Sequence, residues 1–146
     1  MSNRMSIQDY RRMTKAERRE PKRKTKQPEH DNQAAYFDIL KLNYRKFPDL
    51  RFIFAIPNAA KRSPEVAQMM LKEGLKAGVW DLHLPFARRG YGGAWIENKF
   101  GDNKLSAAQI EFGEHFRREN YFTKVSYSVE TSLDITEWYL GITLTR

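Results

Sequence analysis

Residues 78–109 have the sequence GVWDLHLPFARRGYGGAWIENKFGDNKLSAAQ, and their pattern defines the central part of the fold. Its first part alternates apolar and polar residues as a strand does, and so does AWIENKF at 94–100. The glycine-rich segment ARRGYGG between them has the composition of a hairpin connection. The stretch therefore predicts two adjacent strands joined by a turn, followed by a helix with Ser106 as its N-cap.

Side chains on a strand point alternately to opposite faces, which places the polar residues of the two predicted strands. In the first strand Asp81 and His83 share one face. In the second strand Trp95, Glu97 and Lys99 share one face. If the strands pair, an aspartate, a glutamate and a lysine converge on one spot of an otherwise hydrophobic sheet. His83 could then touch metal or substrate, although a lone histidine is more often a neutral packed residue.

Asp81 and Glu97 would repel each other at such a spot unless a cation or a shared proton relieved the repulsion. A hard divalent ion does this well, because Mg²⁺ prefers carboxylate, water and phosphate oxygens. Lys99 beside them could position an attacking water or stabilise charge on a phosphate. The pattern thus indicates phosphodiester cleavage. The alternative is a set of solvated residues on an outer face, since a D…ExK pattern is short and common.

Gln109 favours the site over the solvated face. A helix capped by Ser106 places Gln109 in line with Phe112 and Phe116, on the apolar side. An amide on an apolar stripe needs hydrogen-bond partners. Those partners are either a buried structural group or the water and lysine of the metal site.

The chain resembles the virus-type replication-repair nuclease (VRR-NUC) domain, a branch of the PD-(D/E)XK nuclease superfamily. Five segments carry the resemblance in the family's order: EHDNQ at 29–33, AIPNAAKR at 55–62, LKEGLKAGVWDL at 71–82, IENK at 96–99 and LSAAQ at 105–109. One residue departs from it, because Trp80 stands where the family usually has a proline before the aspartate. The resemblance implies an α/β fold with a PD-(D/E)XK nuclease-like core, in which a central mixed sheet is flanked by helices.

The resemblance also implies a metal centre that holds Mg²⁺ or Mn²⁺. Asp81 and Glu97 would bind the ion, and the backbone carbonyl of Asn98 would be a further ligand. Glu29, on the first helix of the core, matches a family acid that reaches the same centre. The alternative for Glu29 is an acid that the helix dipole favours near a helix N-terminus.

The catalytic residues implied by the resemblance are Asp81, Glu97, Lys99 and Gln109. Lys99 would be the catalytic lysine, and Gln109 would support it as a polar group in the site. The departure at Trp80 is expected to change local geometry and substrate fit more than activity, because the family proline binds no metal.

Two clusters are candidates for binding DNA. Asn58, Lys61 and Arg62 precede a helix start, where free backbone N–H groups and two cations can hold a phosphate. The resemblance points the same way, and the alternative is an ordinary polar loop. Arg88 and Arg89 in the hairpin turn could grip the DNA backbone, or they could form a solvated turn.

Positive charge is concentrated in residues 1–27, which hold ten Lys or Arg against three Asp or Glu. Residues 28–146 hold sixteen against fifteen. The first segment has few large apolar residues, so we expect a basic flexible N-terminal tail at 1–27. The resemblance implies a VRR-NUC nuclease domain at 28–146. The tail is an electrostatic arm for nucleic acid, or a solvated tail that only aids solubility.

The remaining elements follow from periodicity and helix-capping signals. The predicted order is a helix from residue 29 to before Pro48, a buried strand at 50–58, a helix starting at Ser63, the hairpin, a helix at 106–120, a strand at 121–129 and a terminal helix at 132–142. No cysteine is present, and the longest apolar run is FIFAI at 52–56, far too short to cross a membrane. We therefore expect no membrane association and a cytoplasmic protein of a bacterium or a phage-infected host cell.

The function expected from this resemblance is a Mg²⁺-dependent DNA endonuclease. It would cut branched or Holliday-junction-like DNA in replication, recombination or repair, as a homodimer. The alternative is a non-catalytic basic module that binds nucleic acid, in which the acids are only structural. An RNA nuclease is a third reading, since the site chemistry does not recognise the 2′-hydroxyl.

Overall fold

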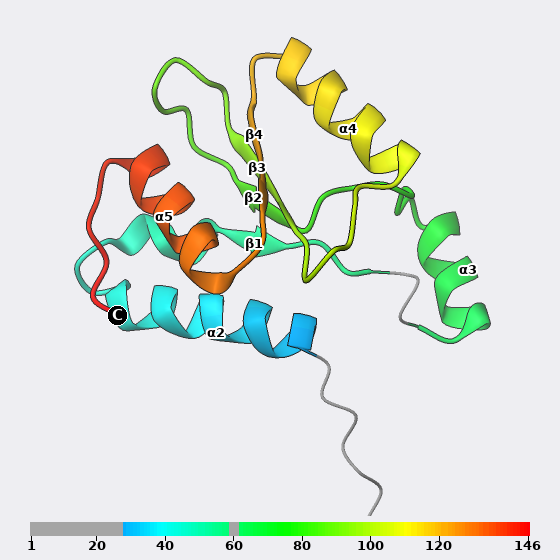
Figure 1. Cartoon of the computed structure of the whole chain (residues 1–146), viewed down its shortest axis with the longest axis horizontal. Coiled ribbons are helices and arrows are strands. Elements are labelled where there is room, and N and C mark those ends of the chain that lie inside the picture. Colours follow the sequence, from blue (N-terminus) through cyan, green and yellow to red (C-terminus); the bar gives the residue numbers. More distant parts are fainter. Residues whose placement is uncertain (1–27, 59–61) are drawn as a thin grey trace, which may run out of the picture.

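The structure is a computed structural model that describes residues 28–58 and 62–146 of the chain. The basic tail at 1–27 and Lys61, for which DNA-binding roles were predicted, lie outside the described residues. Figure 1 shows the arrangement of the elements. They are α2 (Pro28–Asn43), η1 (Pro48–Phe52), β1 (Phe54–Ala55), α3 (Pro64–Lys72), β2 (Leu82–Leu84), β3 (Ala94–Asn98), α4 (Ala107–Arg118), β4 (Phe122–Ser126) and α5 (Val129–Leu140).

The four strands form one mixed sheet in the order β1-β2-β3-β4. β2 is antiparallel to both β1 and β3, as the predicted hairpin requires. β4 is parallel to β3, because α4 carries the chain back along the sheet before β4 begins. The predicted α/β architecture with a central mixed sheet is confirmed.

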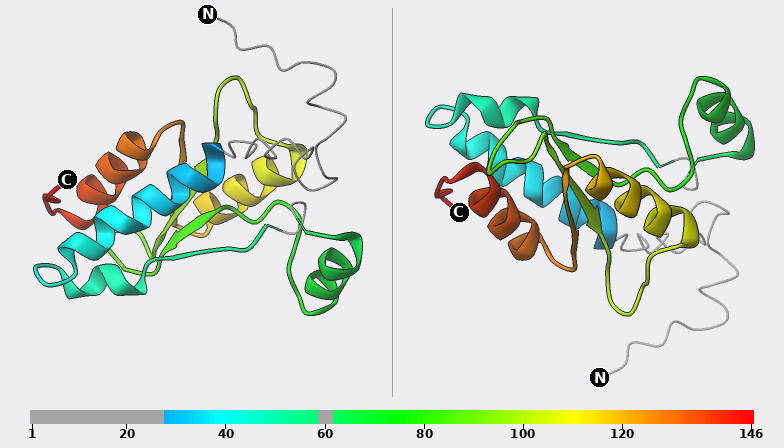
Figure 2. Two further views of the ribbon diagram at one scale, coloured as in Figure 1. Left: turned by 90° about the horizontal axis from the view of Figure 1, so that it is seen from below. Right: turned by 90° about the horizontal axis from the view of Figure 1, so that it is seen from above.

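Helices α2 and α5 lie side by side over one face of the sheet (Figures 1 and 2). This face contributes four fully buried side chains: Leu82, Leu84, Ala94 and Ile96. Tyr36 from α2 packs among them, and its hydroxyl lies 2.8 Å from Thr136 Oγ1 of α5. Full burial of a Leu or Ile side chain is worth about 1.5–3 kcal/mol, so this face carries much of the core.

Helix α4 covers the opposite face of the sheet with aromatic side chains. The rings of Trp95 and Phe112 meet edge to face at 5.0 Å, and Phe116 packs against both. The alternation along β3 is the one predicted: Ile96 enters the core shared with α2 and α5, whereas Trp95 faces α4. The stripe that carries Gln109 therefore lies against the sheet.

The strand predicted at 50–58 is wrong over its first half. Pro48 begins a 3-10 turn there, and this turn points Leu50 into the core with no exposed surface. The strand is reduced to Phe54 and Ala55 at the sheet edge, and Phe54 is 45% exposed rather than buried. An apolar run flanked by prolines is compatible with a strand that buries several side chains and also with a turn that buries one leucine, so the sequence pattern alone did not separate the two.

The terminal helix begins at Val129, three residues earlier than predicted. Ser128 is its N-cap, and its hydroxyl accepts a hydrogen bond from the Thr131 backbone N–H at 3.0 Å. The serine at 128 satisfies an N–H group that would otherwise lack a partner in the first turn. Among the residues that the structure describes, no helix is long and apolar enough to cross a membrane.

Trp80 locks α4 onto the sheet. Its side chain is 2% exposed, and its indole N–H donates to the Gln109 carbonyl oxygen at 2.8 Å. The ring also stacks against Phe112 and lies so close to Gly113 that a Cβ there would come within 2.4 Å of Trp80 Cζ2. Trp80 thus holds the helix that carries Gln109.

Replacing Gly113 by alanine tests this contact. Alanine is favoured over glycine in a helix by about 1 kcal/mol, but overpacking against a buried ring costs about 1–3 kcal/mol. Because Trp80 is buried and held by its hydrogen bond to the Gln109 backbone, we expect Gly113→Ala to lower the free energy of unfolding, measured by urea titration. Glu111→Ala, at an exposed position of α4, should stay within about 0.5 kcal/mol of wild type. A Gly113→Ala protein as stable as wild type would contradict the packing described here.

Candidate active site

Asp81 and Glu97 lie opposite each other at the same end of β2 and β3. The register pairs Leu82 with Ile96, and one further residue along the same register sets Asp81 opposite Glu97. The backbone N–H of Asn98 donates to Asp81 Oδ2 at 2.9 Å, which holds this carboxylate against β3. Both acids are therefore positioned by the strand pairing itself.

Lys99 and Gln109 complete the cluster around Glu97. Lys99 Nζ lies 3.1 Å from Glu97 Oε1, and the Gln109 side-chain amide donates to the same oxygen. The Gln109 side-chain oxygen Oε1 accepts from Lys99 Nζ at 2.8 Å. The structure thus brings Glu97, Lys99 and Gln109 into one hydrogen-bonded triangle beside Asp81, which is the convergence that the sequence predicted.

The start of α4 explains why Gln109 reaches the site. Ser106 caps the helix, and its hydroxyl accepts from the Gln109 backbone N–H at 3.2 Å. The Gln109 side-chain oxygen in return accepts from the Ser106 backbone N–H at 3.0 Å, which completes a capping box. The amide is thereby fixed between the helix N-terminus and the site. The partners of the Gln109 amide are therefore the lysine and the carboxylate of the site, rather than a buried structural group elsewhere.

Glu97 is a buried acid with an unusual environment. The residue is 2% exposed, and its Oε2 has no hydrogen-bond partner among the described residues. Burial and, to a smaller extent, the negative charge of Asp81 raise the pKa of Glu97 to about 7, against the opposing effect of the Lys99 ammonium. A carboxylate oxygen buried without a donor is costly. Its position beside a second carboxylate fits a divalent cation, which would relieve both penalties.

Two carboxylates alone do not make a complete metal shell. The described residues contain no group of three or more His, Cys, Asp or Glu side chains placed to hold a metal ion. This is compatible with Mg²⁺, which commonly uses one or two carboxylates and fills its other positions with waters and substrate phosphate. The donor set at Asp81 and Glu97 therefore fits a magnesium-type ion.

The other predicted metal ligands are placed only in part. The Asn98 side chain turns away from the site, with Oδ1 2.9 Å from the Ser132 hydroxyl, so only its backbone faces Asp81. Glu29 belongs to the first turn of α2, and its side chain lies outside the described residues. Gln33, one helical turn later, lines a small cavity together with Asn98. Helix α2 thus passes the site end of the sheet, and the roles of Glu29 and the Asn98 carbonyl stay predictions.

The two predicted DNA-binding clusters lie at opposite ends of the sheet. Asn58 lines a pocket with Asp81, and Arg62 is exposed just before α3. Arg88 and Arg89 lie in the hairpin at the far end of β2 and β3 (Figure 1). The structure does not bring these two arginines to the site.

Both hairpin arginines have structural partners. The Arg88 guanidinium lies 3.6 Å from the Asp49 carboxylate. The Arg89 guanidinium donates to the Trp138 carbonyl and stacks over the Trp138 ring at 4.4 Å. These contacts attach the hairpin to η1 and α5.

His83 is the neutral packed residue rather than a site ligand. Its ring stacks on Trp95 with centroids 4.1 Å apart, and Nδ1 lies 3.0 Å from the Ala94 carbonyl oxygen. Burial lowers the pKa of His83, which favours the neutral ring. The residue shares a face with Asp81 as predicted, but it belongs to the aromatic layer under α4.

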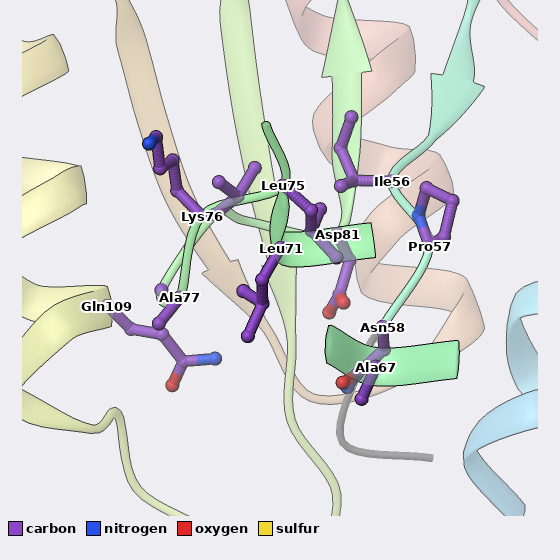
Figure 3. A pocket seen from close by; sticks show the side chains of 12 residues that line it. Ile56, Pro57, Asn58, Ala67, Leu71, Leu75, Lys76, Ala77, Asp81 and Gln109 are labelled. Carbon is purple, nitrogen blue, oxygen red and sulfur yellow. The ribbon is translucent and has the colours of Figure 1, made fainter. Parts of the chain in front are cut away.

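A pocket beside the acids was missed by the sequence reasoning. It has a volume of about 360 Å³ and lies between α3, the segment after it and the end of β1 (Figure 3). Asp81 and Gln109 both line it. The one available signal was the spacing of Leu71 and Leu75, which indicates an apolar surface continuing past the end of α3.

Comparison with known proteins gives a match among solved structures. No family model matches the chain, and neither does any curated protein. A solved structure described as a "VRR_NUC domain protein" superposes with a TM-score of 0.62. It covers 79% of this chain and 89% of its own, at 24% sequence identity. This chain has the VRR-NUC fold. Its mixed sheet and flanking helices fit the α/β nuclease-like core expected from the sequence.

Because the pKa of Glu97 is raised, the free energy of unfolding should depend on pH, and this dependence can be measured without metal. Below its ordinary value of 4.5 the acid is protonated in both the folded and the unfolded chain. Between 4.5 and about 7 the folded chain keeps a proton that the unfolded chain has lost, so stability falls as pH rises through this window. Wild type should therefore lose stability relative to Glu97→Gln between pH 5 and 7 in urea unfolding.

The matched control is Glu114→Gln, at an exposed position of α4. This variant should follow the pH dependence of wild type. Parallel curves for wild type and Glu97→Gln across the same pH range would show that Glu97 ionises normally.

Proposed function

We propose that this protein is a DNA endonuclease that hydrolyses phosphodiester bonds with Mg²⁺ or Mn²⁺. The observation that carries the proposal is the buried Glu97 carboxylate, which faces Asp81 across the strand pair and has an oxygen without a donor among the described residues. Lys99, 3.1 Å from Glu97, supplies the cationic group that such a site needs near the phosphate.

The metal, when bound, would polarise the scissile phosphate and lower the pKa of a coordinated water. Asp81 and Glu97 would hold it, and the Asn98 carbonyl and Glu29 are proposed as further ligands. A cation bound to Glu97 would weaken the ion pair between Glu97 and Lys99. The ammonium then stays in place through Gln109, whose side-chain oxygen accepts from it at 2.8 Å.

Lys99 and Gln109 have distinct tasks in this proposal. The Lys99 ammonium lies at the edge of the site with a side chain that is 14% exposed, so it can meet a phosphate oxygen while remaining partly desolvated. Gln109 touches both Lys99 and Glu97 and sets their separation. We propose that Gln109 is a positioning residue and that Lys99 stabilises the charge that develops on the phosphate.

DNA is the proposed substrate, in branched or junction form. Lys76 lines the pocket, and Arg62 and Lys72 are exposed cations at the two ends of α3, which forms one of its walls. Charges are nearly balanced over residues 28–146, so the basic tail at 1–27 would supply most of the general affinity for the phosphate backbone. A single small domain offers little surface for a branched duplex, and we propose that the protein acts as a homodimer.

Cleavage assays with and without Mg²⁺ test the proposal directly. Plasmid nicking and labelled flap, nicked, four-way-junction and RNA substrates should show metal-dependent cutting of DNA. Glu97→Gln, Asp81→Asn and Lys99→Ala should each lower the rate about 100-fold or more, because each removes charge from the reaction centre. Gln109→Leu should lower it about 10- to 100-fold, as expected for a group that orients the site.

Glu114→Gln on the same helix is the matched control and should keep full activity. DNA binding by wild type without metal-dependent cutting of any substrate would favour the rival function, a non-catalytic nucleic-acid-binding module. Faster cutting of the RNA than of every DNA substrate would replace the proposed substrate.

A further inference from the structure

The pocket of about 360 Å³ is continuous with the proposed catalytic site. In Figure 3 the Asp81 carboxylate and the Gln109 amide reach it from the sheet and from α4. Asp81 is also the acid fixed against β3 by the Asn98 N–H. Any group that fills the pocket therefore lies next to the acids that would hold the metal.

The walls of the pocket are mostly apolar. They are formed by Ala67 and Leu71 of α3, Leu75 beyond it, and Ile56 with Pro57 after β1. Leu71 is 47% exposed, and α3 has no buried residue, so this wall is not part of the main core. An apolar surface kept open to solvent beside a polar site is typical of a ligand-binding surface.

Polar groups stand at the edges of this apolar surface. Asn58 and Gln109 present amides on two sides, and Lys76 also belongs to the lining, with its ammonium pointing away from the other side chains. A flat apolar ligand with a polar edge and a nearby phosphate matches this arrangement. Asparagine and glutamine amides pair well with the hydrogen-bonding edges of bases.

The size of the pocket excludes a base-paired duplex but admits one nucleotide. A volume of about 360 Å³ lies at the lower end of the range of about 300–1,000 Å³ typical of small-ligand sites. Inserting a paired base requires breaking its pairing and stacking, whereas an unpaired base is already available at lower cost. The occupant that fits is a single unpaired base.

We propose that this pocket binds an unpaired nucleobase of the DNA strand that is cut, so that Asp81 and Glu97 act on a phosphodiester next to it. The inference rests on the proposed nuclease function and adds a source of substrate selectivity to it. Selectivity for branched or bulged DNA then comes from a base-binding pocket within one protomer, without any need for a particular dimer geometry.

Ala67→Phe fills the pocket from α3, and Leu71→Ala removes part of its wall. Met69→Phe is the matched control, because Met69 is 53% exposed on the same helix and does not line the pocket. Thermal unfolding of the three variants checks that each is folded. Leu71→Ala keeps the test informative if the larger side chain at 67 disturbs α3.

Binding is measured with 2-aminopurine, a fluorescent base, at a single-nucleotide bulge and at a paired position of the same duplex. Calcium replaces magnesium, since it is a larger oxygen-binding cation with looser geometry. Wild type and Met69→Phe should raise the fluorescence of the bulged base only, and Ala67→Phe and Leu71→Ala should reduce that rise. Fluorescence anisotropy of an end label confirms that the duplex is bound in each case.

Cleavage in Mg²⁺ gives the second readout. Wild type should cut the bulged duplex about tenfold faster than the paired one, and an abasic residue in the bulge should abolish this preference. Ala67→Phe should lose the preference as well. Equal effects of Ala67→Phe and Met69→Phe, or wild-type binding without a fluorescence change, would overturn the inference.

The two proposals fail in different ways. A bulge-specific fluorescence rise that Ala67→Phe abolishes, with no cleavage by any variant, keeps the base pocket and removes the nuclease function. Metal-dependent cleavage that is indifferent to the bulged base keeps the nuclease function and removes the pocket.

Discussion

The antiparallel pairing of β2 with β3 is the constraint on which the site depends. It sets Asp81 opposite Glu97, and the Asn98 N–H holds the first carboxylate in place. A slip of one residue would turn Glu97 toward the core under α2 and α5, because strand side chains alternate between faces. Lys99 and the Gln109 amide offset part of the repulsion, and Glu97 Oε2 has no hydrogen-bond partner in the part of the chain that the structure describes. The pairing of β2 with β3 therefore produces both the geometry of the site and the electrostatic cost of holding two carboxylates together.

Helix α4 is the second support of the site, and its position depends on contacts that lie outside the chemistry. Trp80 hydrogen-bonds the backbone of Gln109 and packs where Gly113 leaves room for it. The capping box at Ser106 then directs the Gln109 amide toward Lys99. Packing in the aromatic layer under α4 is therefore coupled to the distance between the lysine and the carboxylate. A structural change in that layer should therefore change the geometry of the site.

Much of this arrangement could be predicted from the sequence, because local rules fix it. Strand alternation placed Asp81 and Glu97 on one face, and the spacing from a serine N-cap placed Gln109 on the apolar side of its helix. Local patterns did not show that Leu50 enters the core from a 3-10 turn, or that Arg89 packs against Trp138 of α5. The pocket was equally hidden, since its walls come from α3 and from the segment after β1, whose relative position is set by tertiary packing.

The most direct test of the account is a crystal of the wild-type protein soaked in Mn²⁺, with diffraction data collected to locate the ion by its anomalous scattering. The account predicts one strong peak between the two carboxylates, with oxygens of Asp81 and Glu97 at about 2.0–2.2 Å, near the short distances of magnesium-type sites. A peak that is absent there, or that lies away from both acids, would contradict the claim that these residues form a metal centre.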